Sequence, residues 1–281
     1  MGIMLYNTYV KVDQDTTLWF LPRNGARERT DMPRFFVRKD QIHDGLIRII
    51  GDDAHHIARS LRMAAGECVT VCDMQRTEYE CELLSFEDDH AVTARILSSR
   101  QMNTEPPFAA HLYQALPKGD KLDTVIQKAV ECGVASVTPF ESERCIVRCK
   151  PEQEDKKTER RCRIAAEAAK QCGRGCIPEV APTCSYDDML RRAAQADLCL
   201  FCYEGDGTVP LRTLLREKSS VLSMQNPSIS IVIGSEGGFS GAEAERAKDL
   251  GFSMVGLGAR ILRTETASSF VLSALVYELE L

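Results

Sequence analysis

No hydrophobic run of membrane-spanning length occurs in the 281 residues, and the first residues show neither the apolar core nor the cleavage-site pattern of a secretory signal. The lone tryptophan, Trp19, lies in this N-terminal stretch. The composition, 44% hydrophobic and 27% charged, is typical of a globular protein. The chain is long enough for two domains. These absences predict a cytoplasmic rather than a membrane-bound or exported protein.

The sequence also lacks a disulfide framework and a metal-binding motif. Its 12 cysteines are scattered through apolar segments, which favours reduced thiols. Only Cys199 and Cys202 have C-x-x-C spacing, and residues three apart on a strand face opposite sides. No second pair completes a tetrahedral zinc site, and no third ligand is spaced to join His55 and His56. We therefore predict no metal.

A strong positive charge is missing as well. The formal net charge of −6 argues against a protein that coats nucleic acid indiscriminately. A local basic surface is compatible with this charge, because basic residues outnumber acidic ones between residues 144 and 174. Such a run is typical of a solvated helix face or of an RNA-facing surface.

Neither common nucleotide-binding fingerprint is present. There is no G-x-x-x-x-G-K-[ST], and Gly256 and Gly258 do not begin a complete G-x-G-x-x-G. A nucleoside triphosphate or a dinucleotide is therefore disfavoured as the ligand, and an NAD-dependent dehydrogenase is disfavoured with it.

Two glycine-bearing loops near the C-terminus each follow a short apolar run. Residues 229–233 predict a strand buried on both faces, and the loop after it ends at a capping box formed by Ser240 and Glu243. Residues 254–257 predict a second strand, which leads into the loop 256–264. In an open α/β sheet, ligands bind beyond the carboxyl ends of the strands, so these loops predict a ligand pocket.

The two halves of the chain differ in periodicity. Short runs of strand character predict a small β-barrel, interrupted by one helix with Ala54, Ile57, Ala58 and Leu61 on one face. Further along, strands alternate with helices, which predicts an α/β domain with a mostly parallel sheet. Two consecutive prolines mark a linker between the halves. We divide the chain into an extension (1–31), the barrel (32–102), a linker (103–108) and the α/β domain (109–281).

Two helices of the α/β domain have apolar stripes at helical spacing. In the helix predicted for residues 121–132 the stripe is Leu122, Val125, Ile126 and Ala129. In the last helix it is Ala267, Phe270, Val271, Ala274 and Leu275.

Two motifs carry a resemblance to a known family. Residues 233–240 (IGSEGGFS) and 257–267 (LGARILRTETA) resemble the signatures of the RsmE-type 16S ribosomal RNA uridine-N3 methyltransferases, which belong to the SPOUT superfamily of S-adenosylmethionine-dependent enzymes. The longer motif is specific, whereas the shorter one departs at Ser235, where the family usually has proline. Residues 56–67 and 116–133 also match, so the resemblance runs from about residue 33 to the C-terminus.

The resemblance implies more than the residues alone show. It implies an N-terminal PUA-like RNA-binding barrel and a C-terminal SPOUT domain with a trefoil knot, assembled as a homodimer. The implied cofactor is S-adenosyl-L-methionine, and the implied substrate is one uridine of 16S rRNA in the small ribosomal subunit.

The resemblance also assigns roles to residues. The cofactor is expected among three loops, 202–205, 234–239 and 257–264. The predicted cofactor-binding residues are Tyr203, Glu204, Gly234, Glu236, Gly237, Gly238, Leu257, Gly258, Ile261, Leu262 and Thr264. The predicted RNA-binding residues are Arg34, Arg59, Arg62, Lys118, Lys121, Arg144 and Arg174.

Methylation of uridine N3 requires loss of a proton and stabilisation of the charge that spreads to the flanking carbonyl oxygens. Arginine suits the second task, and Arg260 and Arg263 are the catalytic candidates. An alternative for Arg263 is a structural ion pair with Glu265 or Glu236. The proton acceptor is either Glu265 or solvent.

Two other functions fit the same residues. One is a SPOUT methyltransferase that acts on a ribose 2′-hydroxyl or on transfer RNA, because the 257–267 motif reports on the cofactor pocket more than on the target base. The other is a non-catalytic RNA-binding or ribosome-assembly factor with a vestigial pocket, for which Ser235 is the supporting feature.

Overall fold

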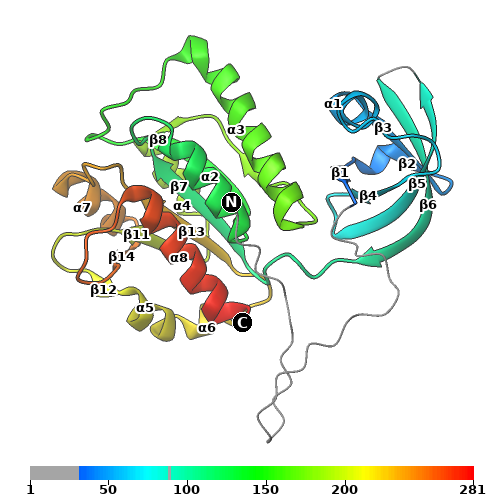
Figure 1. Cartoon of the computed structure of the whole chain (residues 1–281). Coiled ribbons are helices and arrows are strands. Elements are labelled where there is room, and N and C mark those ends of the chain that lie inside the picture. Colours follow the sequence, from blue (N-terminus) through cyan, green and yellow to red (C-terminus); the bar gives the residue numbers. More distant parts are fainter. Residues whose placement is uncertain (1–31, 88–89) are drawn as a thin grey trace, which may run out of the picture. The chain divides into compact units, whose positions relative to one another are not determined.

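The computed structural model describes residues 32–87 and 90–281, so the predicted extension and Trp19 lie outside the described residues. Two β-sheets organise the described chain, one within residues 34–101 and the other within residues 109–256 (Figure 1). No helix in these ranges is long and apolar enough to cross a membrane. All 12 cysteines fall within them and are free thiols, as the sequence predicts.

The first sheet has six strands in the order β1-β4-β5-β6-β3-β2, with β1 and β2 at its edges. The strands are β1 (Arg34–Phe36), β2 (Ile42–His43), β3 (Leu46–Ile50), β4 (Cys68–Cys72), β5 (Thr77–Glu87) and β6 (Ala91–Gln101). Pairing is antiparallel except between β1 and β4. In β3, Ile47 and Ile49 face the apolar core and their neighbours face solvent, which is the alternation that predicts a half-buried strand.

The helix predicted in this region is present but changes its hydrogen-bond pattern midway. A single 3-10 turn, η2 (Lys39–Gln41), precedes β2. Beyond β3, α1 (Asp52–His55) continues into a π-helical turn, η3 (His56–Ser60). Ala54 and Ile57 are buried as predicted, but Leu61 is exposed. A π-turn inserts an extra residue into the helical repeat, so Leu61 no longer falls on the buried face.

The second sheet is parallel throughout and has the order β10-β8-β7-β13-β11-β14-β12, with β9 beside β8. Its strands are β7 (Ala109–Ala115), β8 (Ser136–Glu141), β9 (Glu179–Val180), β10 (Cys184–Ser185), β11 (Leu198–Cys202), β12 (Val209–Pro210), β13 (Ser228–Ile233) and β14 (Ser253–Gly256). The helices are α2 (Lys121–Glu131), α3 (Pro151–Cys172), α4 (Tyr186–Ala193), α5 (Leu211–Glu217), α6 (Ser219–Leu222), α7 (Gly241–Asp249) and α8 (Thr264–Leu279). The predicted α/β architecture is confirmed.

The helix stripes are confirmed with one correction. Every predicted stripe residue of α2 is buried. In α8, Ala267, Val271 and Leu275 are buried together with Leu272, whereas Phe270 is 43% exposed. The prediction for Phe270 is wrong. The buried face of α8 contains residues at intervals of four, Ala267, Val271 and Leu275, and Phe270 lies at the edge of this face.

The parallel sheet places three loops at the same end of its strands. Since β11, β13 and β14 are neighbours and run in the same direction, the loops that follow them leave the sheet at the same end. After β14 the chain crosses back, because α8 packs against α2, β7 and β13 rather than against β14. The start of α8 therefore lies at the end of β13 (Figure 1).

A buried ion pair fixes the first turns of α3. The Glu154 carboxylate accepts hydrogen bonds from Arg161 Nη1 at 2.9 Å and from the backbone amide of Thr183 at 2.7 Å. Burial would raise the pKa of Glu154, but hydrogen bonds from Cys149 and Thr183 and the charge of Arg161 outweigh it and lower the pKa to about 2. Because the ordinary pKa is 4.5, the folded state holds this carboxylate more firmly ionised than the unfolded chain does.

We expect this pair to contribute to acid denaturation. The contribution, about 1–2 kcal/mol after solvent screening, is complete above pH 4.5 and is lost as the pH falls toward 2. Glu154→Gln should lower the free energy of unfolding at pH 7, and the difference from wild type should shrink on acidification. Urea unfolding at several pH values measures this difference. Glu152→Gln, an exposed position on the same helix, is the matched control, and equal pH profiles for both variants would contradict the assignment.

Candidate active site

The loops after β11, β13 and β14 line one cleft of about 800 Å³. It lies beyond the carboxyl ends of the three strands, where the sequence predicts a ligand pocket. All 11 residues predicted to bind the cofactor line it, as do Arg260 and Arg263. Residues far apart in the chain are thus brought together by the strand order β13-β11-β14.

The loop after β13 is a tight turn. The amide of Gly238 donates to the carbonyl of Ser235 at 2.9 Å, and Gly238 has a φ of 64°, which favours glycine. The turn leads into α7 through the predicted capping box: the Ser240 hydroxyl accepts from the Glu243 amide, and the Glu243 carboxylate accepts from the Ser240 amide. Both ends of the loop are therefore fixed.

The neighbouring loop after β8 is pinned to the same turn. The amide of Glu143 donates to the Glu243 carboxylate at 2.7 Å, and Arg144 Nη1 donates to the carbonyl of Gly237 at 3.2 Å. A Cβ on Gly237 would lie 3.0 Å from Arg144 Cβ and 3.2 Å from its carbonyl oxygen. Arg144, predicted to bind RNA, thus contacts the backbone of the glycine loop at the rim of the cleft.

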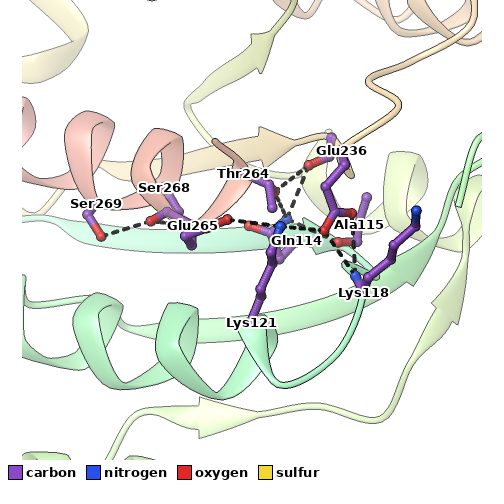
Figure 2. Close-up of polar contacts among 10 residues, drawn as sticks. Gln114, Ala115, Lys118, Lys121, Glu236, Thr264, Glu265, Ser268 and Ser269 are labelled. Carbon is purple, nitrogen blue, oxygen red and sulfur yellow. Dashed lines mark hydrogen bonds and ion pairs between the residues drawn. The ribbon is translucent and has the colours of Figure 1, made fainter. Parts of the chain in front are cut away.

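A buried amide joins the floor of the cleft to α8. Gln114, at the end of β7, donates through Nε2 to Thr264 Oγ1 at 2.8 Å, and Thr264 Oγ1 donates to the carbonyl of Gly234 at 2.6 Å (Figure 2). The register of the sheet places Gln114 beside Ile233, the last residue of β13. These contacts link three segments that are distant in the sequence.

A lysine lies between two carboxylates at the rim (Figure 2). Lys121 Nζ donates to Glu236 at 2.7 Å and lies 3.7 Å from Glu265 Oε2, which has no hydrogen-bond donor. Partial burial would raise the pKa of Glu236, but hydrogen bonds from Lys121 and from backbone amides lower it. The hydrogen bond to Glu236 raises the pKa of Lys121. Both carboxylates pair with lysine, and no described residue forms an ion pair with Arg260 or Arg263.

The walls of the cleft are apolar in part, beside the charged side chains of Lys121, Glu204, Glu236 and three arginines. Ile233, Phe239, Leu257, Leu262 and Ala267 contribute to the apolar part. The thiol of Cys202 also lines the cleft, and burial raises its pKa to about 12, so it stays protonated and is not a nucleophile.

The cleft fits a sulfonium nucleoside better than a phosphorylated one. Its glycines allow close approach to the backbone, and its apolar walls suit a purine. The buried Ser235 hydroxyl has no hydrogen-bond partner among the described residues, so it can bond to a polar atom of a ligand. Of the cationic side chains that line the cleft, Arg144 and Arg260 lie on loops, whereas Arg263 is the N-cap residue of α8 and Lys121 is the first residue of α2.

The remaining predicted RNA contacts lie elsewhere. Arg34 is engaged by Glu78 at 2.7 Å, Arg62 is exposed, and Arg59 occupies the π-helical turn. Lys118 has an exposed side chain, while its backbone amide faces Glu236.

Arg174 requires a correction. Its guanidinium is 6% exposed and donates to Glu105 at 2.5 Å and to the carbonyls of Val130 and Val134. A buried, fully engaged guanidinium cannot reach RNA, so Arg174 has a structural role. Other bases of the 144–174 run are also paired, among them Arg160 with Asp123 and Arg161 with Glu154.

Sequence reasoning missed Gln114 and Thr208, and it included Phe239 only as the last residue of the loop 234–239. Phe239 packs on Phe201 with ring centroids 4.3 Å apart, and this contact holds the glycine loop against β11. Gln114 had a detectable signal, because it is a polar residue within the otherwise apolar end of a strand. Nothing in the local pattern marks Thr208. Its side chain lines the cleft beside Gly256, and a Cβ on Gly256 would lie 3.0 Å from Thr208 Oγ1.

The fold and the cleft define an RNA methyltransferase. Residues 104–276 match the family model described as an RNA methyltransferase domain, and residues 49–97 match the model of an RNA methyltransferase PUA domain. More specifically, the chain belongs to the ribosomal RNA small subunit methyltransferase E family. It is 36% identical to the Bacillus subtilis member over 89% of this chain and 98% of that protein, and 34% identical to the Mesomycoplasma hyopneumoniae member over 86% and 98%.

A solved structure agrees with this assignment. The chain is similar to the ribosomal RNA small subunit methyltransferase E of Neisseria gonorrhoeae bound to S-adenosyl methionine, with 29% identity and a TM-score of 0.75. The match covers 88% of this chain and 98% of the other.

Proposed function

We propose that this protein methylates N3 of one uridine in the 16S rRNA of the small ribosomal subunit, with S-adenosyl-L-methionine as methyl donor. The observation that carries the proposal is the single cleft formed by three loops, with Arg260 and Arg263 on its lining and no carboxylate paired to either among the described residues. Guanidinium groups that are free of internal partners can bind charge on a ligand.

The donor would be held by the glycine turn after β13, the loop after β14, and Tyr203 and Glu204 of the loop after β11. When bound, it supplies an electrophilic methyl group on a sulfonium. The protein must orient the uracil, exclude water and stabilise the charge on the carbonyl oxygens beside N3. Arg260 and Arg263 do the last of these, and their donors are available because Glu236 and Glu265 are paired with Lys121.

Glu265 is the proposed proton acceptor. Glu265 follows the cleft-lining Thr264 but does not itself line the cleft; its Oε2 is buried and receives no hydrogen bond, so a lone pair remains for a proton. Solvent is the alternative acceptor, and loss of activity without loss of cofactor binding in Glu265→Gln would favour the carboxylate.

We propose that residues 32–102 form the PUA-like domain, which binds RNA. Residues 103–108 are the proposed linker, and residues 109–281 are the proposed SPOUT domain. Arg34, Arg59, Arg62, Lys118, Lys121 and Arg144 are the proposed RNA contacts. An unpaired or flipped uridine is required, because N3 is a base-pairing atom.

We further propose a trefoil knot, a homodimer and a cytoplasmic location. The knot is supported by the path from β14 back to α8, which crosses beside β11 and β13 to reach α2 and β7. The homodimer is supported by α8, whose outer side exposes Phe270, Tyr277 and the adjoining Leu281. An apolar outer side favours a second copy of the chain.

Nucleoside analysis of small-subunit RNA tests the function. RNA from cells that lack this protein should lack N3-methyluridine at one position, and purified protein with S-adenosylmethionine should restore it. A methylated ribose 2′-hydroxyl or a methylated transfer RNA would support another SPOUT methyltransferase. No product together with no heat of binding for S-adenosylmethionine would support a non-catalytic assembly factor.

A further inference from the structure

Gln114 lies below the cleft and does not line it. The residue is 0% exposed. Its Nε2 lies 2.8 Å from Thr264 Oγ1, 3.0 Å from the carbonyl of Ala115 and 3.3 Å from the carbonyl of Gly234. Thr264 begins α8 and Gly234 directly follows β13, so one amide group contacts the start of the loop after β13 and the end of the loop after β14.

The orientation of the amide follows from its surroundings. Two carbonyl oxygens accept from it, and the Thr264 hydroxyl uses its own proton on Gly234, so all three neighbours present acceptors. Only the nitrogen of the amide can face them. The amide oxygen, Oε1, then points to a buried region where it has no hydrogen-bond partner.

An unpartnered buried amide oxygen costs about 1–3 kcal/mol relative to a satisfied one. An apolar side chain of similar size would fill this position without that cost. Such a side chain would also lose the three hydrogen bonds of Nε2, so what the amide adds is the connection that these bonds make between the two loops. Exceptions to the rule that buried polar groups have hydrogen-bond partners are expected mainly at functional sites.

We propose that Gln114 is a positioning residue that fixes the glycine loop after β13 relative to the loop that carries Arg260 and Arg263. The inference rests on the proposed function, because it concerns the alignment of methyl donor and uracil. In the structure the two loops meet through Gly234 and Thr264, and Gln114 holds both. Loss of this contact changes their separation, while the residues that touch ligands remain.

The effect should appear in turnover more than in binding. A misplacement of about 1 Å between reacting groups costs about 10²-fold in rate. We expect Gln114→Leu to lower kcat about 10²-fold, with the KM for RNA and the Kd for S-adenosylmethionine changed less than about 5-fold. Gln114→Glu keeps the shape but turns carboxylate oxygen toward three acceptors, so its kcat should fall at least as far.

Ser230→Ala is the matched control. Ser230 lies on β13, is 1% exposed and donates from its hydroxyl to the carbonyl of Ala193 at 2.8 Å, away from the cleft lining. This variant also loses a buried hydrogen bond of the same strand, yet its kcat should stay within about 2-fold of wild type. An equal loss of kcat in Ser230→Ala and Gln114→Leu would overturn the positioning role.

The partner residue provides the second test, which applies even where Gln114 variants fail to fold. Thr264→Val removes the hydroxyl that accepts from Gln114 and should lower kcat about 10²-fold. In the double variant with Gln114→Leu the losses should not multiply, because both remove one connection.

Failure of the inference is distinguishable from failure of the proposed function. Normal kcat in Gln114→Leu and Thr264→Val, with active wild-type protein, would overturn only the positioning role. Wild-type protein that neither binds S-adenosylmethionine in a calorimeter nor methylates RNA would overturn both.

Discussion

Arg260→Ala should lower methyl incorporation into small-subunit RNA about 10²–10³-fold while the protein stays folded and still binds S-adenosylmethionine. Arg260 is exposed on the loop after β14 and lines the cleft, and no described carboxylate pairs with it. Its removal therefore disrupts no internal contact of the described structure. The expected loss comes from charge on the uracil that is no longer stabilised.

Single-turnover transfer of a labelled methyl group measures this loss, and calorimetry measures the Kd of the cofactor. Arg212→Ala is the matched control, because Arg212 is exposed on α5 and does not line the cleft. Arg260→Lys should retain part of the activity, since it keeps the charge but not the planar set of donors. Unchanged turnover in Arg260→Ala would remove Arg260 from the mechanism and leave Arg263 as the candidate.

Gly237→Val should weaken binding of S-adenosylmethionine at least 10-fold. A Cβ at Gly237 already approaches Arg144 Cβ to 3.0 Å and the Arg144 carbonyl oxygen to 3.2 Å, and the two further methyl groups of valine need more space. Arg144 cannot move away freely, because the amide of Glu143 beside it is bonded to the buried Glu243. The glycine turn must shift into the cleft instead.

Gly241→Val provides the comparison. Gly241 opens α7 a few residues further on, and a Cβ there meets no atom within 4 Å. This variant changes the same residue types near the same loop, so its Kd should stay within about 2-fold of wild type. Equal affinities for Gly237→Val and wild type would contradict the assignment of this turn to the cofactor.

The sequence was sufficient for elements whose signal is local. Residues 229–233 form a strand buried on both faces because four apolar residues and the small Ser230 leave no solvated side, and Ser240 with Glu243 forms a capping box because the hydroxyl and the carboxylate are three residues apart. Local pattern failed where packing decides the outcome. The π-helical turn moved Leu61 to the surface, and the docking of α8 moved Phe270 to an edge.

For the site, the sequence predicted which residues line the cleft but not how they are held. The glycines and arginines of the two motifs are recognisable because their residue types are unusual. The contacts of Gln114 and Lys121 depend on β7 and α2 lying beside β13 and α8, which is a matter of strand order. Strand order does not follow from periodicity. Arg174 was misassigned for a related reason, because burial of a charged residue depends on a distant partner, Glu105.

The position of Thr264 has a consequence for biosynthesis. Thr264 supplies part of the cleft wall and holds Gly234, and it is translated after every other residue that lines the cleft except Ala267. A nascent chain that has not yet released α8 from the ribosomal exit tunnel therefore has an open-sided cleft. A polypeptide that ends before this helix lacks Thr264 and its hydrogen bond to Gly234, so we expect it to bind the methyl donor more weakly than a chain that includes α8.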